Sequence, residues 1–317
     1  MVNYAGCYPG QGAQKPQMAL DFYAQFATVR ELFVLASDIS GKNLWSLLAN
    51  GDEAELMQTQ NTQLAVTLVN RSATLALQEM GLSLACHAGF SLGELSAYRA
   101  AGIIDDVALF TIVTKRGKLF ANASAQAEKK YGELGMAAIV GLGFVKVQKI
   151  LKEAGVTQVF CANDNSPTQV VISGVEKEIN LCAEKLKEAG AKRIVPLRVS
   201  GPFHTPFMDE IEEEFAEFLK IIMFTSPQMP VYTNVTGKLI TSGREAKQAC
   251  SRQLSSPVRW TTIMQSIVED QNLFHALEVG PGTVLTGLWK SSGFGVSCKG
   301  AGTYNQIMEL AEGVPNE

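Results

Sequence analysis

The chain has 317 residues, 46% of them hydrophobic, and a formal net charge of -4. This composition excludes a disordered chain and predicts one large domain with an insertion, or two unequal domains. The slight negative charge argues against a nucleic-acid-binding surface of ordinary size. The six cysteines form no C-x-x-C pair, the N-terminus lacks signal-peptide features, and no apolar run approaches the roughly 18 to 20 residues of a membrane span. We therefore expect a cytoplasmic protein that does not enter a membrane.

The first motif along the chain is "YPGQGAQ" at residues 8–14, which follows a predicted strand. It matches neither the phosphate loop G-x-x-x-x-G-K-[ST] nor the dinucleotide pattern G-x-G-x-x-G, so it does not predict a nucleotide site. Two interpretations fit these residues. The segment is either an ordinary glycine turn or a turn whose backbone N–H groups stabilise a reacting oxyanion.

The second motif, "GFSLG" at residues 89–93, lies between a short apolar strand at 84–88 and a helix predicted over 92–101. Gly102 is at the C-cap position of that helix. The pattern G-x-S-x-G is typical of the strand-to-helix elbow that exposes a serine hydroxyl above a sheet. A turn without chemistry has the same local pattern, so these residues alone leave open whether Ser91 is a nucleophile.

The next helix, in "DVALFTIVTKRGKLF", carries an arginine on its apolar face. Helical spacing puts Arg116 in one stripe with five apolar residues, Leu109, Ile112, Val113, Leu119 and Phe120. A guanidinium cannot lose its proton, so its burial requires an anionic or strongly accepting partner. That partner is either an internal acid such as Glu94 or a carboxylate of the substrate.

The succession of predicted strands and helices changes near residue 135, and the new pattern continues to residue 199. Its segments read β-α-β-β-α-β, which is the ferredoxin-like arrangement. The loop "SGPFHTP" then leads to a helix with Phe207, Ile211, Phe215 and Phe218 near one face, and "HALEVGPGTVLTGLWK" predicts strand, turn and helix. We predict an α/β protein with a large α/β-hydrolase-like subdomain at 1–130 and 199–317. A small ferredoxin-like subdomain at 131–198 is inserted into it.

A serine nucleophile requires a base, and the chain contains three histidines. His87 lies in the strand before the serine and His275 precedes an apolar strand, so both are expected to be packed structural residues. His204 lies in "GPFHTP", between two prolines at the junction of the two subdomains, where a cleft would open. No acid between Ser91 and His204 has the context of a hydrolase acid loop, so a Ser–His dyad oriented by a main-chain carbonyl is predicted.

Seven motifs occur in one order across nearly the whole chain: "PGQGAQ", "GFSLGELSA", "KRG", "ANDNSPTQVVISG", "GPFHTPFM", "RQLSSPVRW" and "EVGPGTVLTGL". In this order they resemble the malonyl-coenzyme A:acyl carrier protein transacylases. That family has a hydrolase-like large subdomain and a ferredoxin-like small one. It moves malonyl from coenzyme A to the phosphopantetheine thiol of acyl carrier protein through an acyl-serine intermediate, in fatty acid synthesis.

The resemblance implies a role for each matching residue. Ser91 is the expected nucleophile and His204 its general base, while the backbone amides of Gln11 and Leu92 form the oxyanion hole. Arg116 is expected to bind the free carboxylate of malonyl. A further expectation is that Gln253 lies beside the site, with nearby backbone supporting the histidine.

Two phenylalanines bear on specificity. A phenylalanine before the histidine accompanies malonyl in related polyketide acyltransferases, so Phe203 indicates a malonyl substrate. Most family members have histidine before the serine, whereas this chain has Phe90. The polar contact of that histidine is expected to be lost, which affects fine tuning of the site and not the reaction class.

The expected partners are malonyl-coenzyme A and acyl carrier protein, with no nucleic acid and no membrane, and the expected state is a monomer. Coenzyme A enters as a thioester substrate, and neither a cofactor nor a metal ion is expected. Two alternatives share the same Ser–His site. One is a free-standing acyltransferase that serves a polyketide synthase, and the other is an acyl hydrolase in which water discharges the acyl-serine.

Overall fold

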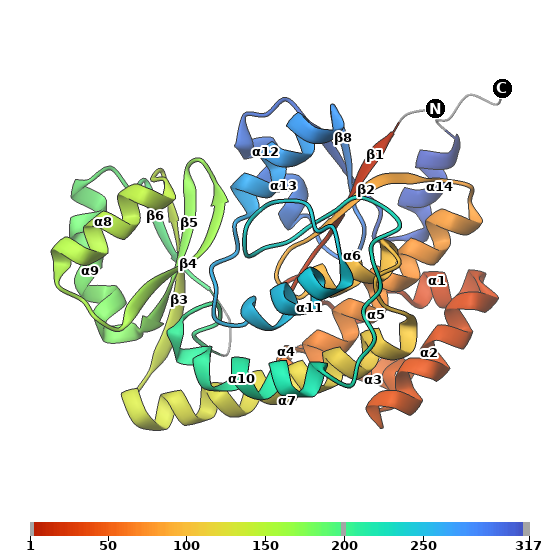
Figure 1. The fold of residues 1–317 in the computed structure, drawn as a ribbon, viewed down its shortest axis with the longest axis horizontal. Helices are drawn as coiled ribbons and strands as arrows, with labels where there is room; N and C mark the ends of the chain where they lie inside the picture. The colour runs from red at the N-terminus through yellow and green to blue at the C-terminus, as the bar shows by residue number, and fades with distance from the viewer. Residues whose placement is uncertain (1–2, 198–200, 313–317) are drawn as a thin grey trace.

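The computed structural model describes residues 3–197 and 201–312, and its two sheets divide the chain into a larger and a smaller part (Figure 1). The larger part contains a five-stranded sheet in the order β7-β2-β1-β8-β9, in which every adjacent pair is parallel. These strands are β1 (Tyr4–Tyr8), β2 (Leu84–Gly89), β7 (Val231–Tyr232), β8 (His275–Glu278) and β9 (Ser297–Gly300). Parallel neighbours need crossover connections, which accounts for the helices between the strands.

The helices of the larger part are α1 (Leu20–Gln25), α2 (Ala27–Ser40), α3 (Leu44–Asn50), α4 (Glu53–Met57), α5 (Thr59–Glu79), α6 (Gly93–Ala100), α7 (Asp106–Tyr131), α10 (Asp209–Leu219), α11 (Gly243–Arg252), α12 (Trp260–Gln271), α13 (Val284–Ser292) and α14 (Tyr304–Glu312). They cover both faces of the sheet. Side chains alternate along β1, so that Tyr4 and Tyr8 pack into one hydrophobic core and Ala5 and Cys7 into a second core on the opposite face. The second core is completed by α12 and α13. Within the described ranges, no helix is long and apolar enough to cross a membrane.

The smaller part has an antiparallel sheet in the order β4-β5-β3-β6. Its elements are β3 (Leu134–Val140), α8 (Phe144–Ala154), β4 (Val159–Ser166), β5 (Gln169–Val175), α9 (Glu176–Glu188) and β6 (Arg193–Pro196). This succession confirms the predicted β-α-β-β-α-β order. The predicted boundary between residues 198 and 199 lies outside the described residues.

The alternation of β3 decides which face of the small sheet meets the larger part. Ala137 and Ile139 pack into the core formed with α8 and α9. Met136 and Ala138 point the other way and join the core of the larger part. The small sheet therefore contributes one face to its own core and the opposite face to the junction between the two parts.

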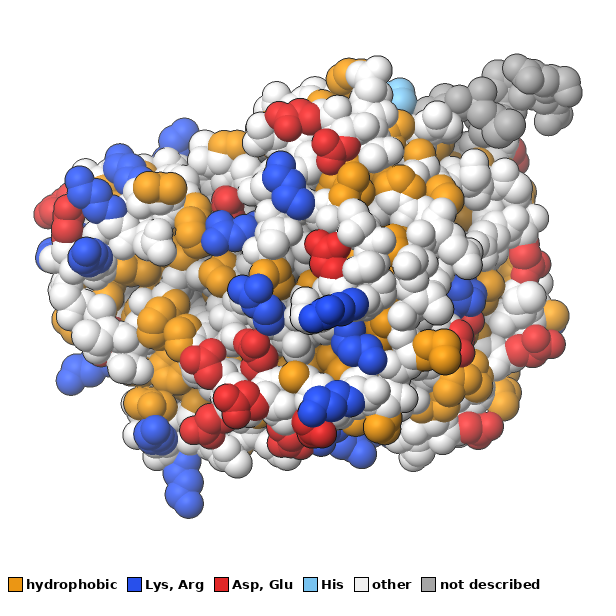
Figure 2. All heavy atoms as spheres, in the orientation of Figure 1, with side chains coloured by type: hydrophobic (Ala, Val, Ile, Leu, Met, Phe, Trp, Pro, Cys, Tyr) orange, Lys and Arg blue, Asp and Glu red, His pale blue; other side chains and the backbone are white. Residues whose placement is uncertain are grey.

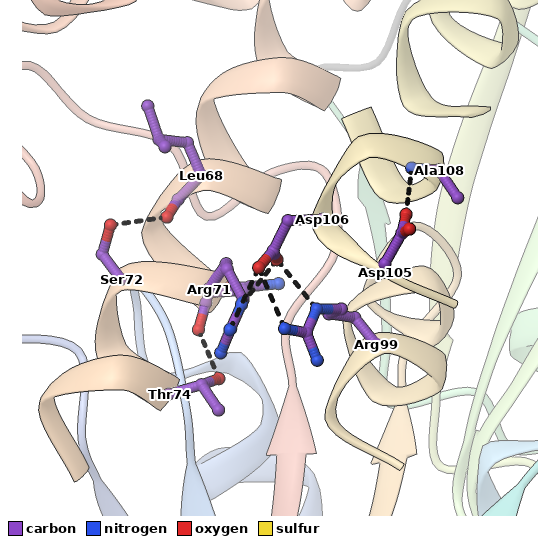
Figure 3. A network of polar contacts seen from close by, with 9 residues as sticks. Leu68, Arg71, Ser72, Thr74, Arg99, Asp105, Asp106 and Ala108 are labelled. Atoms are coloured by element: carbon purple, nitrogen blue, oxygen red, sulfur yellow. Dashed lines mark hydrogen bonds and ion pairs between the residues drawn. The ribbon is translucent and has the colours of Figure 1, made fainter. Parts of the chain in front are cut away.

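The N-terminus of α7 is anchored by two neighbouring aspartates (Figure 3). Asp105 is the N-cap, and its side chain accepts a hydrogen bond of 2.7 Å from the N–H of Ala108. Asp106 accepts paired hydrogen bonds from Arg71 on α5 and from Arg99 on α6. Burial alone would raise the pKa of Asp106, but the two guanidinium groups outweigh it and lower that pKa. This network fixes the helix that carries Arg116.

The two aspartates allow a matched test of this network. Asp106→Ala is expected to lower the free energy of unfolding by about 2 to 3 kcal/mol, since it leaves two arginines, one of them almost fully buried, without their shared carboxylate. Asp105→Ala should cost about 1 kcal/mol, the usual loss for a helix cap. Chemical denaturation of both variants beside the unmodified chain measures the difference. Equal losses would contradict the anchoring role of Asp106.

Candidate active site

Ser91 occupies a sharp turn between β2 and α6, with a φ angle of 51°. The two glycines of the motif are required by close backbone approach. A Cβ on Gly89 would lie 2.0 Å from the carbonyl of Gly93, and a Cβ on Gly93 would lie 2.0 Å from the carbonyl oxygen of Tyr8. Both distances are far below van der Waals contact, so the turn tolerates only glycine at these positions.

His204 is brought to Ser91 from 113 residues further along the chain. The distance from Ser91 Oγ to His204 Nε2 is 2.6 Å, and His204 Nδ1 lies 2.8 Å from the main-chain oxygen of Gln253. A carbonyl oxygen can only accept, so the proton is on Nδ1 and Nε2 is left to accept from the serine hydroxyl. The main-chain carbonyl that orients the ring is thus that of Gln253.

The environment of His204 keeps its ring neutral. The residue is buried, and burial, followed by the positive charge of Arg116, lowers its pKa to about 4. At neutral pH the ring is therefore unprotonated and can take a proton from Ser91. The φ angle of His204 is 60°. Its main-chain N–H donates to the main-chain oxygen of Leu254 at 3.1 Å, and this bond holds the backbone in that conformation.

The other two histidines lie away from the serine hydroxyl. His87 is buried in β2, and its Nδ1 lies 3.1 Å from the hydroxyl of Tyr8. His275 is exposed, so the expectation that it is packed was wrong. It is the first residue of β8, where its ring lies at 64° to that of Tyr4 with ring centres 6.0 Å apart, and burial begins one residue later. An apolar strand therefore need not bury its first residue.

Arg116 is 2% exposed on the inner face of α7 and contacts neutral partners. Its Nη1 donates to Gln63 Oε1 and its Nη2 to Gln253 Oε1, both at 2.9 Å. Its guanidinium carbon lies 4.4 Å from the centre of the Phe120 ring. Across the described ranges, no carboxylate is within ion-pair distance of it. Burial lowers the pKa of Arg116 to about 10, so the buried cation stays charged at neutral pH.

Glu94 is not the partner of that arginine. Its carboxylate is fully buried and accepts from the N–H of Asn234 at 2.6 Å, from the hydroxyl of Thr233 at 3.1 Å, and from the hydroxyl of Tyr98. This acid therefore belongs to a hydrogen-bond network that joins α6 to the loop after β7. Of the two interpretations left open by the sequence, the internal pair with Glu94 is excluded.

A cavity of about 330 Å³ opens over Ser91 and His204, between the two parts of the chain. The larger part lines it with Gln11, Gly12, Phe90, Ser91, Phe203, His204 and Val284. The small sheet lines it with Met136, Ala138, Asn163, Asn165, Gln169 and Val171, and Leu197 follows directly after that sheet. Phe203 is held in place by Phe120, whose ring centre is 4.6 Å away. The chamber is mainly apolar, with amide side chains at several points on its wall.

Two main-chain N–H groups beside the serine are available as donors. Among the described residues, neither the N–H of Gln11 nor that of Leu92 has a hydrogen-bond acceptor. The loop of Gln11 packs against the elbow, because a Cβ on Gly10 would lie 2.5 Å from the oxygen of Phe90 and 3.6 Å from the nitrogen of Leu92. Free donors in this position can stabilise negative charge on an acyl oxygen.

Sequence reasoning missed two amide side chains of the site. Gln63 contacts Arg116, and Asn234 accepts a hydrogen bond of 2.7 Å from the N–H of Ser91. A buried polar stripe of α5, Thr59, Gln63, Thr67 and Asn70, could have indicated the first. The second follows a strand of two residues and has no local signal. The described residues contain no group of three or more metal-ligating side chains.

These features match a known protein family. The model of the acyl transferase domain family matches residues 7–297. The chain belongs to this family. A malonyl CoA-acyl carrier protein transacylase of Escherichia coli (strain K12) is 39% identical to this acyl transferase over 296 residues, which cover 92% of this chain and 93% of that protein.

Solved structures agree with this assignment. An acyl carrier protein S-malonyltransferase from Vibrio cholerae O1 superposes with a TM-score of 0.91 at 36% identity, covering 98% of this chain and 100% of that one. A malonyl-transacylase in complex with its type II PKS acyl-carrier protein gives a TM-score of 0.92 at 36% identity, covering 99% and 100%. The family resemblance and the α/β fold with an inserted ferredoxin-like part are confirmed.

Phe90 of this acyl transferase is held by aromatic packing. The Phe90 ring meets that of Trp260 edge to face, with ring centres 5.5 Å apart and planes at 74°. Trp260 is fully buried, and its indole N–H has no acceptor among the described residues. An apolar contact thus occupies this position beside the serine.

Proposed function

We propose that this acyl transferase moves malonyl from coenzyme A to the phosphopantetheine thiol of acyl carrier protein through an ester on Ser91. The observation that carries the proposal is the combination of a serine–histidine pair at 2.6 Å with a buried arginine that has no carboxylate partner among the described residues. The pair supplies nucleophilic chemistry, and the cation suits a substrate with a free carboxylate.

In the first half-reaction, His204 Nε2 takes the proton of Ser91 as Oγ attacks the thioester carbonyl carbon. The carbonyl oxygen becomes negatively charged and is stabilised by the N–H groups of Gln11 and Leu92. The C–S bond then breaks, the carbonyl reforms, and the coenzyme A sulfur leaves with the proton held by His204. The product is malonyl-Ser91 and free coenzyme A.

The second half-reaction reverses these steps with a different thiol. His204 takes the proton of the phosphopantetheine thiol, whose sulfur attacks the ester carbonyl. The same two N–H groups stabilise the oxyanion until the C–O bond breaks, and Ser91 Oγ recovers its proton from His204. The chain's own side chains supply the nucleophile and the base, so the proposed cycle uses no cofactor. We also propose that the reaction takes place in the cytoplasm.

The charge distribution supports a site for the acidic carrier protein on the smaller part. Acidic side chains gather over α10 (Figure 2), and this face would repel an acidic partner. Four exposed cations of the smaller part have the opposite sign: Lys185, Lys187, Lys192 and Arg193. Arg193 is on β6 opposite Val140, which in turn pairs with Gln169 of the cavity wall.

Mass spectrometry of the protein tests the proposal directly. Mixing with malonyl-coenzyme A should add one malonyl group to the peptide that contains Ser91, and acyl carrier protein should remove it and gain the same mass. Discharge by water at the same rate without a carrier would identify a hydrolase instead. Discharge by a polyketide carrier alone would favour the free-standing polyketide acyltransferase.

The lowered pKa of His204 predicts an unusual pH profile. A neutral ring is needed to accept the proton of Ser91, and this form predominates above pH 4 instead of above the ordinary value of 6.5. The value of kcat/KM for malonyl-coenzyme A should therefore stay constant from pH 7 down to about pH 5 and fall as pH approaches 4. A fall centred near pH 6.5 would contradict this environment for the base.

Replacing Arg116 tests the choice of acyl group. Arg116→Ala removes the positive charge that we expect to bind the malonyl carboxylate. The value of kcat/KM for malonyl-coenzyme A should therefore fall, by an amount that corresponds to a rise of about 2 to 5 kcal/mol in activation free energy. Acetyl-coenzyme A has no such carboxylate, so its transfer should be preserved or improved. Arg116→Lys should restore malonyl transfer in part, because it keeps the charge without the planar fork. Parallel kinetics measure the preference, and an unchanged ratio of malonyl to acetyl transfer would refute the role.

A further inference from the structure

The strand beside the elbow ends before it reaches Ser91. Strand β7 has two residues and pairs with β2 at Val231↔His87 and Tyr232↔Ala88. Beyond Tyr232 the chain turns, since the N–H of Gly237 donates to the oxygen of Thr233. The main-chain groups of Gly89 and Ser91 that face this side therefore need a partner from elsewhere.

The side chain of Asn234 supplies that partner. Its Nδ2 donates to the oxygen of Gly89 at 2.6 Å, and its Oδ1 accepts from the N–H of Ser91 at 2.7 Å. In a parallel ladder, one residue donates its N–H to the carbonyl of the residue before its neighbour, and its own carbonyl accepts from the N–H of the residue after that neighbour. The carboxamide of Asn234 makes this same pair of bonds around Phe90, so it takes the place of the main-chain N–H and C=O of one residue of β7.

The elbow is held on its other side by main chain and by Gln253. The N–H of Phe90 donates to the oxygen of Tyr8 on β1 at 2.9 Å. The oxygen of Ser91 accepts from Gln253 Nε2 at 2.9 Å. With Asn234, these contacts engage both main-chain polar groups of Ser91, while the N–H of the following Leu92 has no acceptor among the described residues.

Asn234 is itself fixed by its surroundings. The residue is fully buried, its N–H donates to Glu94 Oε2 at 2.6 Å, and its oxygen accepts from the N–H of Arg259 at 3.0 Å. Main chain and side chain are therefore both held, and the carboxamide has no solvent to rotate into. Such a group can keep its two bonds to the elbow at constant geometry.

We propose that Asn234 is a positioning residue for acyl transfer. It completes the ladder beside β2, holds Ser91 in its left-handed conformation, and thereby sets Oγ at 2.6 Å from His204 Nε2 and leaves the N–H of Leu92 free. This inference rests on the proposed function, because it assumes that Ser91 is the acylated residue. Small displacements of a nucleophile have large effects on rate, of about 10²-fold per ångström.

Substitutions at Asn234 separate positioning from folding. Asn234→Leu removes both bonds to the elbow, and we expect kcat to fall on the order of 10²-fold with KM for malonyl-coenzyme A changed by less than about threefold. Asn234→Asp keeps the acceptor for Ser91 and loses the donor for Gly89. Its kcat should lie between those of the leucine variant and the unmodified chain.

Thr233→Val provides the matched control. It removes a hydrogen bond from the neighbouring residue to Glu94, in the same buried loop, without touching the elbow. We expect it to lower Tm while kcat stays within about threefold of the unmodified chain. If Asn234→Leu does not fold, Asn234→Asp and Thr233→Val still give the comparison.

The measurements are single-turnover acylation by malonyl-coenzyme A, discharge to acyl carrier protein, and melting curves. Slowing of both half-reactions in the Asn234 variants, beyond that of Thr233→Val at similar Tm, supports the inference. Unchanged rates in Asn234→Asp, or equal slowing in Thr233→Val, would overturn it. Absence of a Ser91 adduct in the unmodified chain would instead refute the proposed function, so the two failures are distinguishable.

Discussion

Ser91→Ala is expected to abolish the malonyl adduct and to reduce transfer to acyl carrier protein on the order of 10⁶-fold, as in other enzymes that lose a serine nucleophile. The substitution removes Oγ, the atom that lies 2.6 Å from His204 Nε2, and leaves no group at the elbow to accept the acyl chain. Alanine fits the same turn, so Tm should change little. Intact-mass spectrometry after mixing with malonyl-coenzyme A measures the adduct.

A second serine near the same histidine provides the control. Ser255 lines a separate cavity behind His204, and its hydroxyl donates to Glu212. Ser255→Ala should therefore keep the adduct and most of the transfer rate. A malonyl adduct of undiminished amount on the Ser91→Ala protein would show that the nucleophile is another residue.

His204→Ala is expected to slow both half-reactions on the order of 10⁴-fold, the upper range for loss of a general base. Without the ring, no group is positioned to take the proton of Ser91 during acylation or the proton of the incoming thiol during discharge. The remaining rate should rise with hydroxide concentration, because solvent must then remove the proton. Rapid-quench measurement of each half-reaction across pH tests both expectations.

The exposed His275 allows a matched comparison, since it is the same residue type at a site without contact to Ser91. His275→Ala should retain the full rate of acylation and discharge. If His204→Ala slowed discharge but not acylation, the histidine would act only on the incoming thiol, and another base would be required for Ser91.

Part of this site could be predicted from local sequence because its causes are local. Gly89 and Gly93 mark the elbow, since any side chain there would collide with neighbouring backbone. Helical periodicity placed Arg116 on the buried face of α7, where the structure has it. In the smaller part, the periodicity of hydrophobic residues within each short segment indicated the β-α-β-β-α-β order.

The partners of these residues could not be predicted in this way. Whether Arg116 meets Glu94 or two glutamines depends on which helices pack together, and Gln63 and Gln253 come from distant segments. Burial of the first residue of a strand also depends on what lies beside it, as the exposed His275 demonstrates. Periodicity describes the faces of one element and carries no information on the neighbour that a face will meet.

By itself, the sequence determined which positions turn, which faces are buried, and that a serine, a histidine and an arginine are candidates for one chemistry. The tertiary structure alone decided that Ser91 and His204 lie within hydrogen-bonding distance and that the main-chain oxygen of Gln253 orients the His204 ring. It also decided that Asn234 completes the ladder beside the serine. The physical reason is that these contacts join residues 49 to 143 positions apart. Their geometry is set by how the sheet and its covering helices pack, and local sterics and propensity do not extend that far.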